Sequence, residues 1–335
     1  MADTPRVQQT VTYSIYGLTM ESSFPFRFRL KTTSAAPDFR FVYHGVVEER
    51  KPSGREVSGS CWESDSDQTV MRLFVTDDRE TIVFPGIAAF ECSPGAIYAS
   101  TYAEGLEYLV EICLVGYVLA YWLERRGTSV IHASAVVVDG RAAAFIAGTS
   151  RGKTTTACGF VAAGIPLLTD DTLALEVGAD AGPFAIAHPG YPQMKLLPEQ
   201  LAMLGIGPAG FGKVHPLFEK LMVPIGDGIG HYCDRPLPLA RIYVLDRIEP
   251  DAEPSVVAVP AAAALIELVR HSFAAELVDA IDRGPKRLNR LATIARVTSM
   301  KRLRVPAGYE RLPDVRSLVL EDMREAPAVT PGSGV

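Results

Sequence analysis

Residues 11–100 alternate between apolar and polar positions in several short runs. Examples are VTYSIYGLTMES from Val11, FRFRLKTT from Phe26 and FRFVYHGVVEE from Phe39. A period of two places one face of a strand in a core and the other in water. Proline and glycine residues separate the runs, as turns between strands require. The pattern predicts an antiparallel, β-rich N-terminal domain over residues 1–104 that carries no obvious chemistry.

Residues 105–127 hold the longest apolar segment of the chain, GLEYLVEICLVGYVLAYWLERR. Glutamates interrupt or bound it, and the unbroken stretch Ile112–Leu123 is well short of the roughly 20 residues that a membrane span requires. The segment therefore predicts a buried helix that links the two halves of the chain, and it argues against insertion into a membrane.

A third pattern, over residues 128–176, separates apolar runs by small and acidic residues. The predicted elements are a strand Val130–Val138, a turn Asp139–Gly140, a strand Arg141–Ile146, a small-residue loop Ala147–Gly152, a helix Lys153–Ala163 and an apolar run Ile165–Leu168. The last run stops at Asp170 and Asp171. Strand, loop, helix, strand and acidic pair in this order are typical of a P-loop nucleotide site.

The loop before the helix offers the chemistry of a phosphate site. Its amides and the first helical turn point at one spot, where the helix dipole adds partial positive charge. The residues expected to contact the nucleotide are Gly148, Thr149, Ser150, Arg151, Gly152, Lys153, Thr154 and Thr155. Lys153 is expected to reach the outer phosphates, and the hydroxyl of Thr154 to bind Mg²⁺, which prefers oxygen ligands. Asp170 and Asp171 are expected at the carboxyl end of the neighbouring strand, where open α/β sheets bind ligands.

The motif departs from the pattern G-x-x-x-x-G-K-[ST], because Ala147 occupies the first glycine position. If that position needs a positive φ, alanine costs roughly 1 kcal/mol there. An ordinary βαβ unit with a Gly–Lys turn is the alternative to a phosphate site. The hairpin spacing also places His132 near Gly148, and so beside the phosphates; the alternative is a histidine in a strand core.

Composition and charge argue against several kinds of partner and site. The chain has 335 residues, enough for one large domain or two ordinary ones, and a net charge of −6 without a long basic run. This argues against nucleic acid or an anionic membrane as the main partner. The five cysteines form no CxxC pair, so neither a disulfide framework nor a zinc site is indicated. The first residues lack the apolar core of a signal peptide, and a cytoplasmic location is expected.

The stretch IHASAVVVDGRAAAFIAGTSRGKTTTACGFVAAGIPLLTDD resembles the C-terminal catalytic domain of the HPr kinase/phosphorylase family. It looks most similar to the HPr-kinase-like serine kinases found with lasso-peptide biosynthesis. Flanking segments, among them YSIYGLTMESSFPF, HPGYPQMKLLPEQL and PLPLARIYVLDR, extend the resemblance over about residues 11–320. It implies an α+β chain with an α/β core, in which residues 128–325 form a P-loop kinase domain of the HPr-kinase/PEP-carboxykinase type.

The resemblance also implies an activity and the residues that carry it. The activity is transfer of phosphate from ATP, with Mg²⁺, to the C-terminal serine of a lasso or other ribosomal precursor peptide. The family's catalytic histidine, lysine and aspartate fall on His132, Lys153 and Asp171, and its magnesium-binding hydroxyl on Thr154; Asp170 is expected to bind magnesium as well. Within the loop, Ala147 and Ser150 replace glycines and Thr149 replaces serine.

The sequence leaves two other functions open. A nucleotide-binding regulatory module without kinase activity and a kinase for a small-molecule hydroxyl acceptor are the alternatives, and the sequence leaves homo-oligomerisation open. Residues 205–235 predict a loop region over the site. For Lys195, Lys213 and Lys220, a solvated surface position is favoured over contact with acceptor or phosphates. Helices are expected over Ala261–Asp282, Pro285–Arg296 and residues 312–323, and a disordered tail over residues 326–335.

Overall fold

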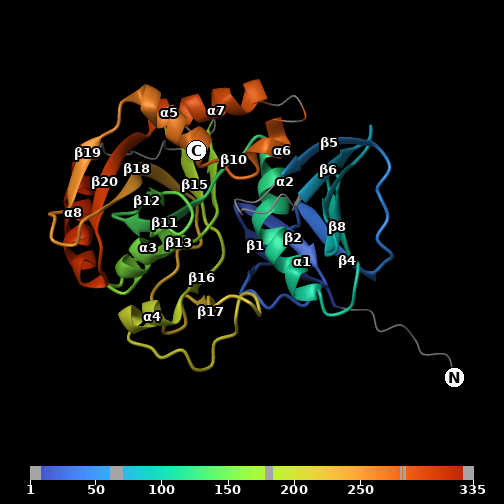
Figure 1. Cartoon of the computed structure of the whole chain (residues 1–335), viewed down its shortest axis with the longest axis horizontal. Coiled ribbons are helices and arrows are strands. Elements are labelled where there is room, and N and C mark those ends of the chain that lie inside the picture. Colours follow the sequence, from blue (N-terminus) through green and yellow to red (C-terminus); the bar gives the residue numbers. More distant parts are fainter. Residues whose placement is uncertain (1–8, 61–70, 178–183, 280, 282–283, 327–335) are drawn as a thin grey trace. The chain divides into compact units, whose positions relative to one another are not determined.

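The computed structural model describes residues 9–60, 71–177, 184–279, 281 and 284–326. The chain divides into two compact units, residues 1–118 and 119–335, each with its own large sheet. Figure 1 shows the elements of both units in chain order. The mixed α/β composition with large sheets agrees with the expected fold class. The predicted tail falls almost entirely on residues 327–335, which lie outside the described part of the chain.

The first unit is a β-sheet, as the alternating pattern predicts. Its strands are β1 (Val11–Ile15), β2 (Leu18–Ser22), β3 (Lys31–Thr32), β4 (Phe39–Val46), β5 (Arg55–Ser60), β6 (Met71–Val75), β7 (Glu80–Phe84), β8 (Ala88–Cys92) and β9 (Ala96–Thr101). They lie in the order β3-β1-β2-β4-β9-β8-β7-β6-β5. Most neighbours are antiparallel, but β4 runs parallel to both β2 and β9, so the expectation of a purely antiparallel sheet is wrong.

The long apolar segment is helical, as predicted. It comprises α1 (Glu107–Cys113), a π-helical segment (Leu114–Val118) and α2 (Leu119–Arg125). Within the first unit, the buried Glu111 carboxylate accepts hydrogen bonds from Arg27 and from the backbone amide of Phe28. Among the described residues, no helix combines the length and the apolar character that crossing a bilayer demands.

The second unit is built on a mixed sheet. Its strands are β10 (Ser129–Ile131), β11 (Ala133–Val138), β12 (Arg141–Ile146), β13 (Leu167–Thr169), β14 (Leu173–Glu176), β15 (Ile186–His188), β18 (Leu237–Ile248), β19 (Ser255–Ala258) and β20 (Ser299–Pro306). The main path is β10-β14-β15-β18-β12-β11-β13, and β20 pairs with β18 and β19. Because β12, β18 and β20 are parallel, their carboxyl ends meet at one edge of the sheet. A separate hairpin joins β16 (Gln193–Leu196) and β17 (Leu221–Pro224).

Helices cover both faces of this sheet (Figure 1). They are α3 (Lys153–Val161), α4 (Pro198–Leu201), α5 (Ala261–Arg270), α6 (Ala275–Asp279), α7 (Gly284–Val297) and α8 (Leu312–Arg324). Phe145 packs with residues of α3 and α8 on one face, whereas Ala144 and Ile146 pack with residues of α5 and α7 on the other. This division follows from the alternation of side chains along β12.

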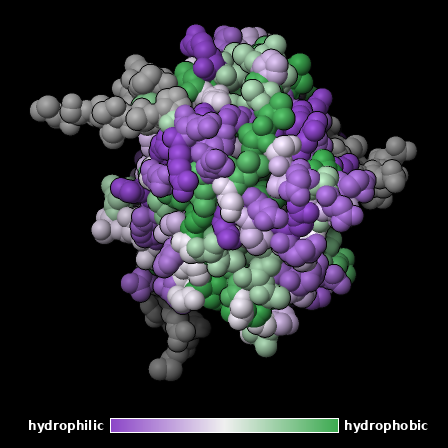
Figure 2. Space-filling view, turned by 90° about the vertical axis from the view of Figure 1, so that its left-hand side faces the viewer, coloured by the Kyte–Doolittle hydropathy of each residue, from purple (hydrophilic) through white to green (hydrophobic). Residues whose placement is uncertain are grey.

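The side of the second unit that carries α8 and β19 is shown in space-filling form in Figure 2. Hydrophilic residues dominate this face, and a strip of hydrophobic residues runs down its middle. Leu312, Val315 and Val319 of α8 are buried, and Asp314 and Glu321 of the same helix are exposed. The helix predicted for this segment is present, and its buried face carries apolar residues at helical spacing.

Two predicted elements are each interrupted. The strand expected over Val130–Val138 breaks at His132, so that β10 pairs with β14 while β11 pairs with β12. The helix expected over Ala261–Asp282 ends at Arg270 and resumes only as α6; its last residues, including Asp282, fall partly outside the described chain. The turn Asp139–Gly140 is confirmed, with Val138 opposite Arg141 and positive φ at both turn residues.

Candidate functional site

The loop 147–152 connects β12 to the amino end of α3. Two of its residues adopt left-handed backbone conformations, Ser150 with φ 57° and Gly152 with φ 95°. Ala147 is buried and has no positive φ, so the condition under which alanine would be strained at this position is not met. The non-glycine residue that bears left-handed strain in the loop is Ser150.

Lys153 is the first residue of α3, and its side chain folds back over the loop. Its Nζ donates to the carbonyl oxygens of Ala147 at 2.9 Å and Gly148 at 3.1 Å, and the residue is only 6% exposed. Burial lowers the pKa of Lys153, and the carboxylates of Asp171 and Asp170 oppose this effect. The ammonium group is therefore within electrostatic reach of both acidic residues, and carbonyl oxygens hold it in the loop.

Asp170 follows β13 and collects hydrogen bonds from three directions. Its Oδ1 accepts from Ser134 Oγ at 2.7 Å and from Thr154 Oγ1 at 2.9 Å. Its Oδ2 accepts from the backbone amide of Lys195 at 3.2 Å. The residue is 4% exposed, and burial followed by the charge of Asp171 raises its pKa. The structure thus brings together Thr154 and Asp170, the two residues expected to bind magnesium.

The donor set around Asp170 fits a hard cation. The hydroxyl groups of Ser134 and Thr154 both donate to Oδ1 of the Asp170 carboxylate, so three oxygen atoms lie close together. Mg²⁺ characteristically takes one or two protein carboxylates and completes its octahedron with water and substrate phosphates. Within the described ranges there is no cluster of three or more histidine, cysteine, aspartate or glutamate side chains that would form a metal cage. The residues therefore fit a magnesium ion that arrives with a nucleotide.

Asp171 lies beside Asp170 but faces a different set of groups. Its carboxylate is 2.7 Å from Lys195 Nζ and 3.3 Å from His132 Nε2, and its side chain is 31% exposed. Burial would raise the pKa of Asp171, but the positive charge of Lys195 and the contact with His132 outweigh burial and hold that pKa below its usual range. Asp171 is accordingly an anion at neutral pH, held in a left-handed conformation with φ 74°.

His132 occupies the break between β10 and β11. Its backbone amide donates to the carbonyl oxygen of His271 at 2.8 Å, and its ring stacks on Phe273 with centroids 5.4 Å apart. Burial lowers the pKa of His132 to about 4, against the opposing effect of Asp171. A neutral imidazole therefore contacts Asp171. The register of the hairpin, with Ala133 opposite Ile146, also places His132 next to the start of the phosphate loop, as the spacing predicts.

Comparisons with known proteins leave the family of the chain open. No family model matches the sequence, and no curated protein matches it. Among solved structures, the chain is similar to the Hpr(Ser) kinase/phosphatase from Coxiella burnetii, with 12% sequence identity and a TM-score of 0.33. The alignment covers 58% of this chain and 97% of that chain. A likeness at this level does not decide the activity of this protein.

Lys195 is the site residue that the sequence reasoning placed wrongly. A solvated position was favoured, yet its side chain is 15% exposed and is paired with Asp171. Lys195 lies in the short strand β16 between the buried residues Met194 and Leu196, an alternation that by itself favours an exposed side chain, so no local signal reports its pairing. Lys213 and Lys220 are exposed, in agreement with the prediction. The charge of Lys220 nevertheless lowers the pKa of both Lys153 and Asp171.

The other residues that the sequence predicts to contact the nucleotide lie around the start of α3. Gly148, Thr149, Ser150 and Arg151 are exposed, and Thr155 Oγ1 accepts a hydrogen bond of 2.6 Å from Gln200 Nε2 of α4. In chemical terms, the site combines a loop of backbone amides, an ammonium group, a buried carboxylate with hydroxyl partners and a second carboxylate whose pKa is held below its usual range. Such a combination can bind a polyanion with a divalent cation and can orient a hydroxyl group.

Proposed function

We propose that this protein is an ATP- and Mg²⁺-dependent kinase that phosphorylates a hydroxyl group. The observation that carries the proposal is the 2.9 Å hydrogen bond between Thr154, at the start of α3, and Asp170, with Asp171 next to it in the chain and in electrostatic reach of Lys153. The sequence resemblance supports a serine of a peptide as the acceptor, in particular the C-terminal serine of a lasso precursor.

The first requirement of such a kinase is to hold the phosphates. The amides of loop 147–152 and the amino end of α3 supply hydrogen-bond donors and a favourable dipole. Lys153 would exchange its bonds to the carbonyls of Ala147 and Gly148 for bonds to the outer phosphates. Mg²⁺, when bound with the nucleotide by Thr154 and Asp170, neutralises charge on the phosphates.

The second requirement is to orient the acceptor. In the transfer, the acceptor oxygen bonds to the γ-phosphorus, the bond from that phosphorus to ADP breaks, and the hydroxyl proton leaves the acceptor. Asp171 accepts the hydrogen of the hydroxyl and receives the proton late. The low pKa of Asp171 makes it a weak base, so its larger contribution is to aim the hydroxyl in line. Lys195 and the neutral His132 hold the carboxylate in place.

The replacement of Asp171 by asparagine tests the proposal. Purified Asp171→Asn and wild-type proteins are incubated with radiolabelled ATP, Mg²⁺ and two acceptor sets, serine-terminated peptides and small hydroxyl metabolites. We expect wild type to label a peptide and the variant to transfer phosphate at least about 100-fold more slowly. ATP affinity, measured by calorimetry, should stay within a few-fold of wild type.

The matched control is Asp251→Asn, which removes an exposed carboxylate from the turn after β18 and should leave transfer unchanged. Undiminished transfer by Asp171→Asn would reject the assignment of Asp171. Binding of ATP by wild type without transfer to any acceptor would favour the regulatory nucleotide-binding module. Labelling of small metabolites alone would favour the small-molecule kinase.

A further inference from the structure

Arg247 lies near the end of β18, beside the phosphate loop. Strand β18 runs parallel to β12 with Val244 opposite Ile146, the last residue of β12. The chain beyond Val244 therefore continues alongside loop 147–152. In the order of the sheet, β18 flanks β12 on one side, whereas β11 and then β13, which leads into Asp170 and Asp171, lie on the other. Arg247 thus approaches the loop from the side opposite to the acidic pair.

The guanidinium group of Arg247 rests against the α-carbon of Gly152. A Cβ atom built on Gly152 would lie 2.8 Å from Arg247 Nη2 and 3.2 Å from its Cζ. A side chain at position 152 would strain the left-handed backbone and would displace the end of the arginine side chain. The glycine, which directly precedes Lys153, therefore lets the guanidinium group rest against the backbone of the loop.

One nitrogen of the Arg247 guanidinium group is hydrogen-bonded to the protein, and the other nitrogens can donate hydrogen bonds to a ligand. Nη1 donates to the carbonyl oxygen of Pro306, at the end of β20, at 3.3 Å. Across the described residues, no carboxylate forms an ion pair with Arg247, whereas Lys195 is paired with Asp171 and Lys153 is held by carbonyl oxygens. Arg247 is also exposed. It is therefore a cation beside the loop, and no described carboxylate is in direct contact with it.

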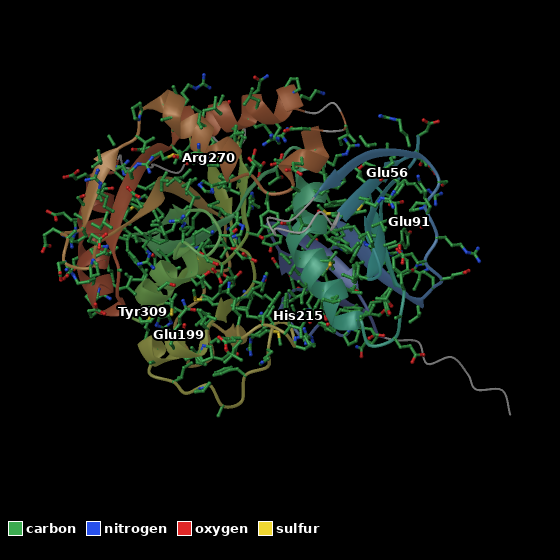
Figure 3. All side chains as sticks on the ribbon, in the orientation of Figure 1. Glu56, Glu91, Glu199, His215, Arg270 and Tyr309 are labelled. Atoms are coloured by element: carbon green, nitrogen blue, oxygen red, sulfur yellow. The ribbon has the colours of Figure 1, made fainter. Side chains whose placement is uncertain are left out.

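Tyr309 lies within electrostatic reach of Arg247 on this side of the loop. Tyr309, three residues after Pro306, is exposed, and its labelled position in Figure 3 is close to Glu199 of α4. Burial and the charge of Glu199 raise the pKa of Tyr309, whereas Arg247 lowers it. Arg247 and Tyr309 therefore belong to one exposed rim beside the first turns of α3.

We propose that Arg247 is a phosphate-binding residue whose guanidinium group contacts the phosphate chain of the nucleotide from the β18 side of the loop. The proposal rests on the proposed nucleotide site. An arginine fork matches phosphate oxygens and forms charge-assisted hydrogen bonds with them. It also supplies a second fixed positive charge where the phosphates carry their negative charge.

A purely structural role of Arg247 would give a different experimental result. If Arg247 only ties the end of β18 to Pro306, its loss lowers the stability of the fold and leaves the affinity for nucleotide unchanged. Arg247→Gln and Arg247→Lys are therefore compared with wild type in the full-length protein. ATP and adenosine are titrated by calorimetry in the presence of Mg²⁺, and thermal unfolding is followed by circular dichroism.

We expect Arg247→Gln to weaken ATP binding about tenfold or more, the loss that one charge-assisted hydrogen bond predicts. Arg247→Lys, which keeps the charge without the fork, should recover part of the affinity even if the glutamine variant folds poorly. Adenosine binding should be the same in wild type and both variants. The matched control Arg304→Gln removes an exposed arginine from neighbouring β20 and should leave ATP affinity unchanged.

Two results would overturn the assignment of Arg247. One is ATP affinity within twofold of wild type in Arg247→Gln; the other is an equal loss for ATP and adenosine. Lys153→Ala is measured alongside, because loss of ATP binding in that variant together with intact binding in Arg247→Gln would reject the role of Arg247 and keep the nucleotide site. A wild-type protein that binds no ATP would reject both.

Discussion

Two polar residues at the site have positive φ angles. Ser150 and Asp171 both adopt left-handed conformations, which are uncommon for residues other than glycine, although aspartate visits them more often than serine does. Such outliers persist where surrounding structure over-determines them, and they gather at functional sites. Asp171 is held by Lys195 and His132, and its strain therefore keeps a charged carboxylate in one orientation. Ser150 has no comparable partner in the described structure, which makes its strain open to a direct test.

We expect Ser150→Gly to raise the free energy of unfolding by about 0.5 kcal/mol. Relief of the left-handed conformation gains roughly 1 kcal/mol, and the greater freedom of glycine in the unfolded chain offsets part of it. Chemical denaturation of the full-length protein measures the change. The matched control is Thr149→Gly, at a neighbouring loop position without positive φ, which should lower the stability. Equal effects of the two substitutions would contradict the strain at Ser150.

At this scale the sequence predicts that the candidate site residues lie close together, but it does not predict their surroundings. His132, Lys153, Thr154, Asp170 and Asp171 come together because one hairpin, the helix after it and the next strand carry them all. The pairing of Lys195 with Asp171 depends on β16, which lies far along the chain, and no local pattern reports it. Whether Ala147 is strained could not be predicted, because the motif gives residue types and leaves the φ angles of the loop undetermined.

Among the elements, one predicted strand and one predicted helix are interrupted by contacts between residues that are distant in sequence. The run Val130–Val138 is mostly apolar and contains no glycine or proline, so its pattern gives no strong reason to stop at His132. The break arises because the amide of His132 bonds to His271 while Ile131 forms a bridge with Ser272. The same contacts explain the end of α5 before Ser272, where the sequence has no helix breaker. Contacts distant in sequence override local propensity here.

Helix α8 is tied to the sheet by one buried carboxylate. Asp322 accepts hydrogen bonds from Tyr243 Oη at 2.7 Å and Arg241 Nε at 3.3 Å, and Lys301 contacts it as well. Burial would raise the pKa of Asp322, but the hydrogen bonds and charges of Lys301 and Tyr243 outweigh burial and lower it. The three partners come from β18 and β20, so this cluster fixes α8 on the strands that end beside loop 147–152.

We expect Asp322→Asn to lower the free energy of unfolding by about 3 kcal/mol at neutral pH, because it leaves buried cations without their counter-ion. The folded pKa of Asp322 lies below the unfolded value of about 3.9, so the unfolded state binds the proton more readily and stability falls as the pH drops through this window. Denaturation of both proteins at several pH values should give a constant difference between pH 5 and 7 that shrinks below about pH 4. A difference that persists unchanged at pH 3 would contradict the charge-based account.

For the whole molecule, the sequence predicts two parts but leaves the boundary between them uncertain. A domain end at residue 104 and a linking helix over 105–127 follow from the change in apolar pattern. The compact units instead meet between residues 118 and 119, inside the helical stretch. The sequence of an apolar helix does not indicate which of two hydrophobic cores buries each part of it. Only long-range contacts, such as the bond from Tyr16 to the carbonyl of Val115, assign its first half to the first unit.

All residues assigned to the site lie in the second unit, between His132 and Arg247. The hydrophobic clusters on both faces of its sheet are also formed by this unit alone. A fragment of residues 119–335 should therefore fold and bind Mg–ATP with an affinity within about fivefold of the full chain, a difference of at most roughly 1 kcal/mol. Calorimetry gives the affinity, and circular dichroism verifies that the fragment is folded. A folded fragment that binds no ATP, beside a full chain that does, would mean that the first unit completes the nucleotide site.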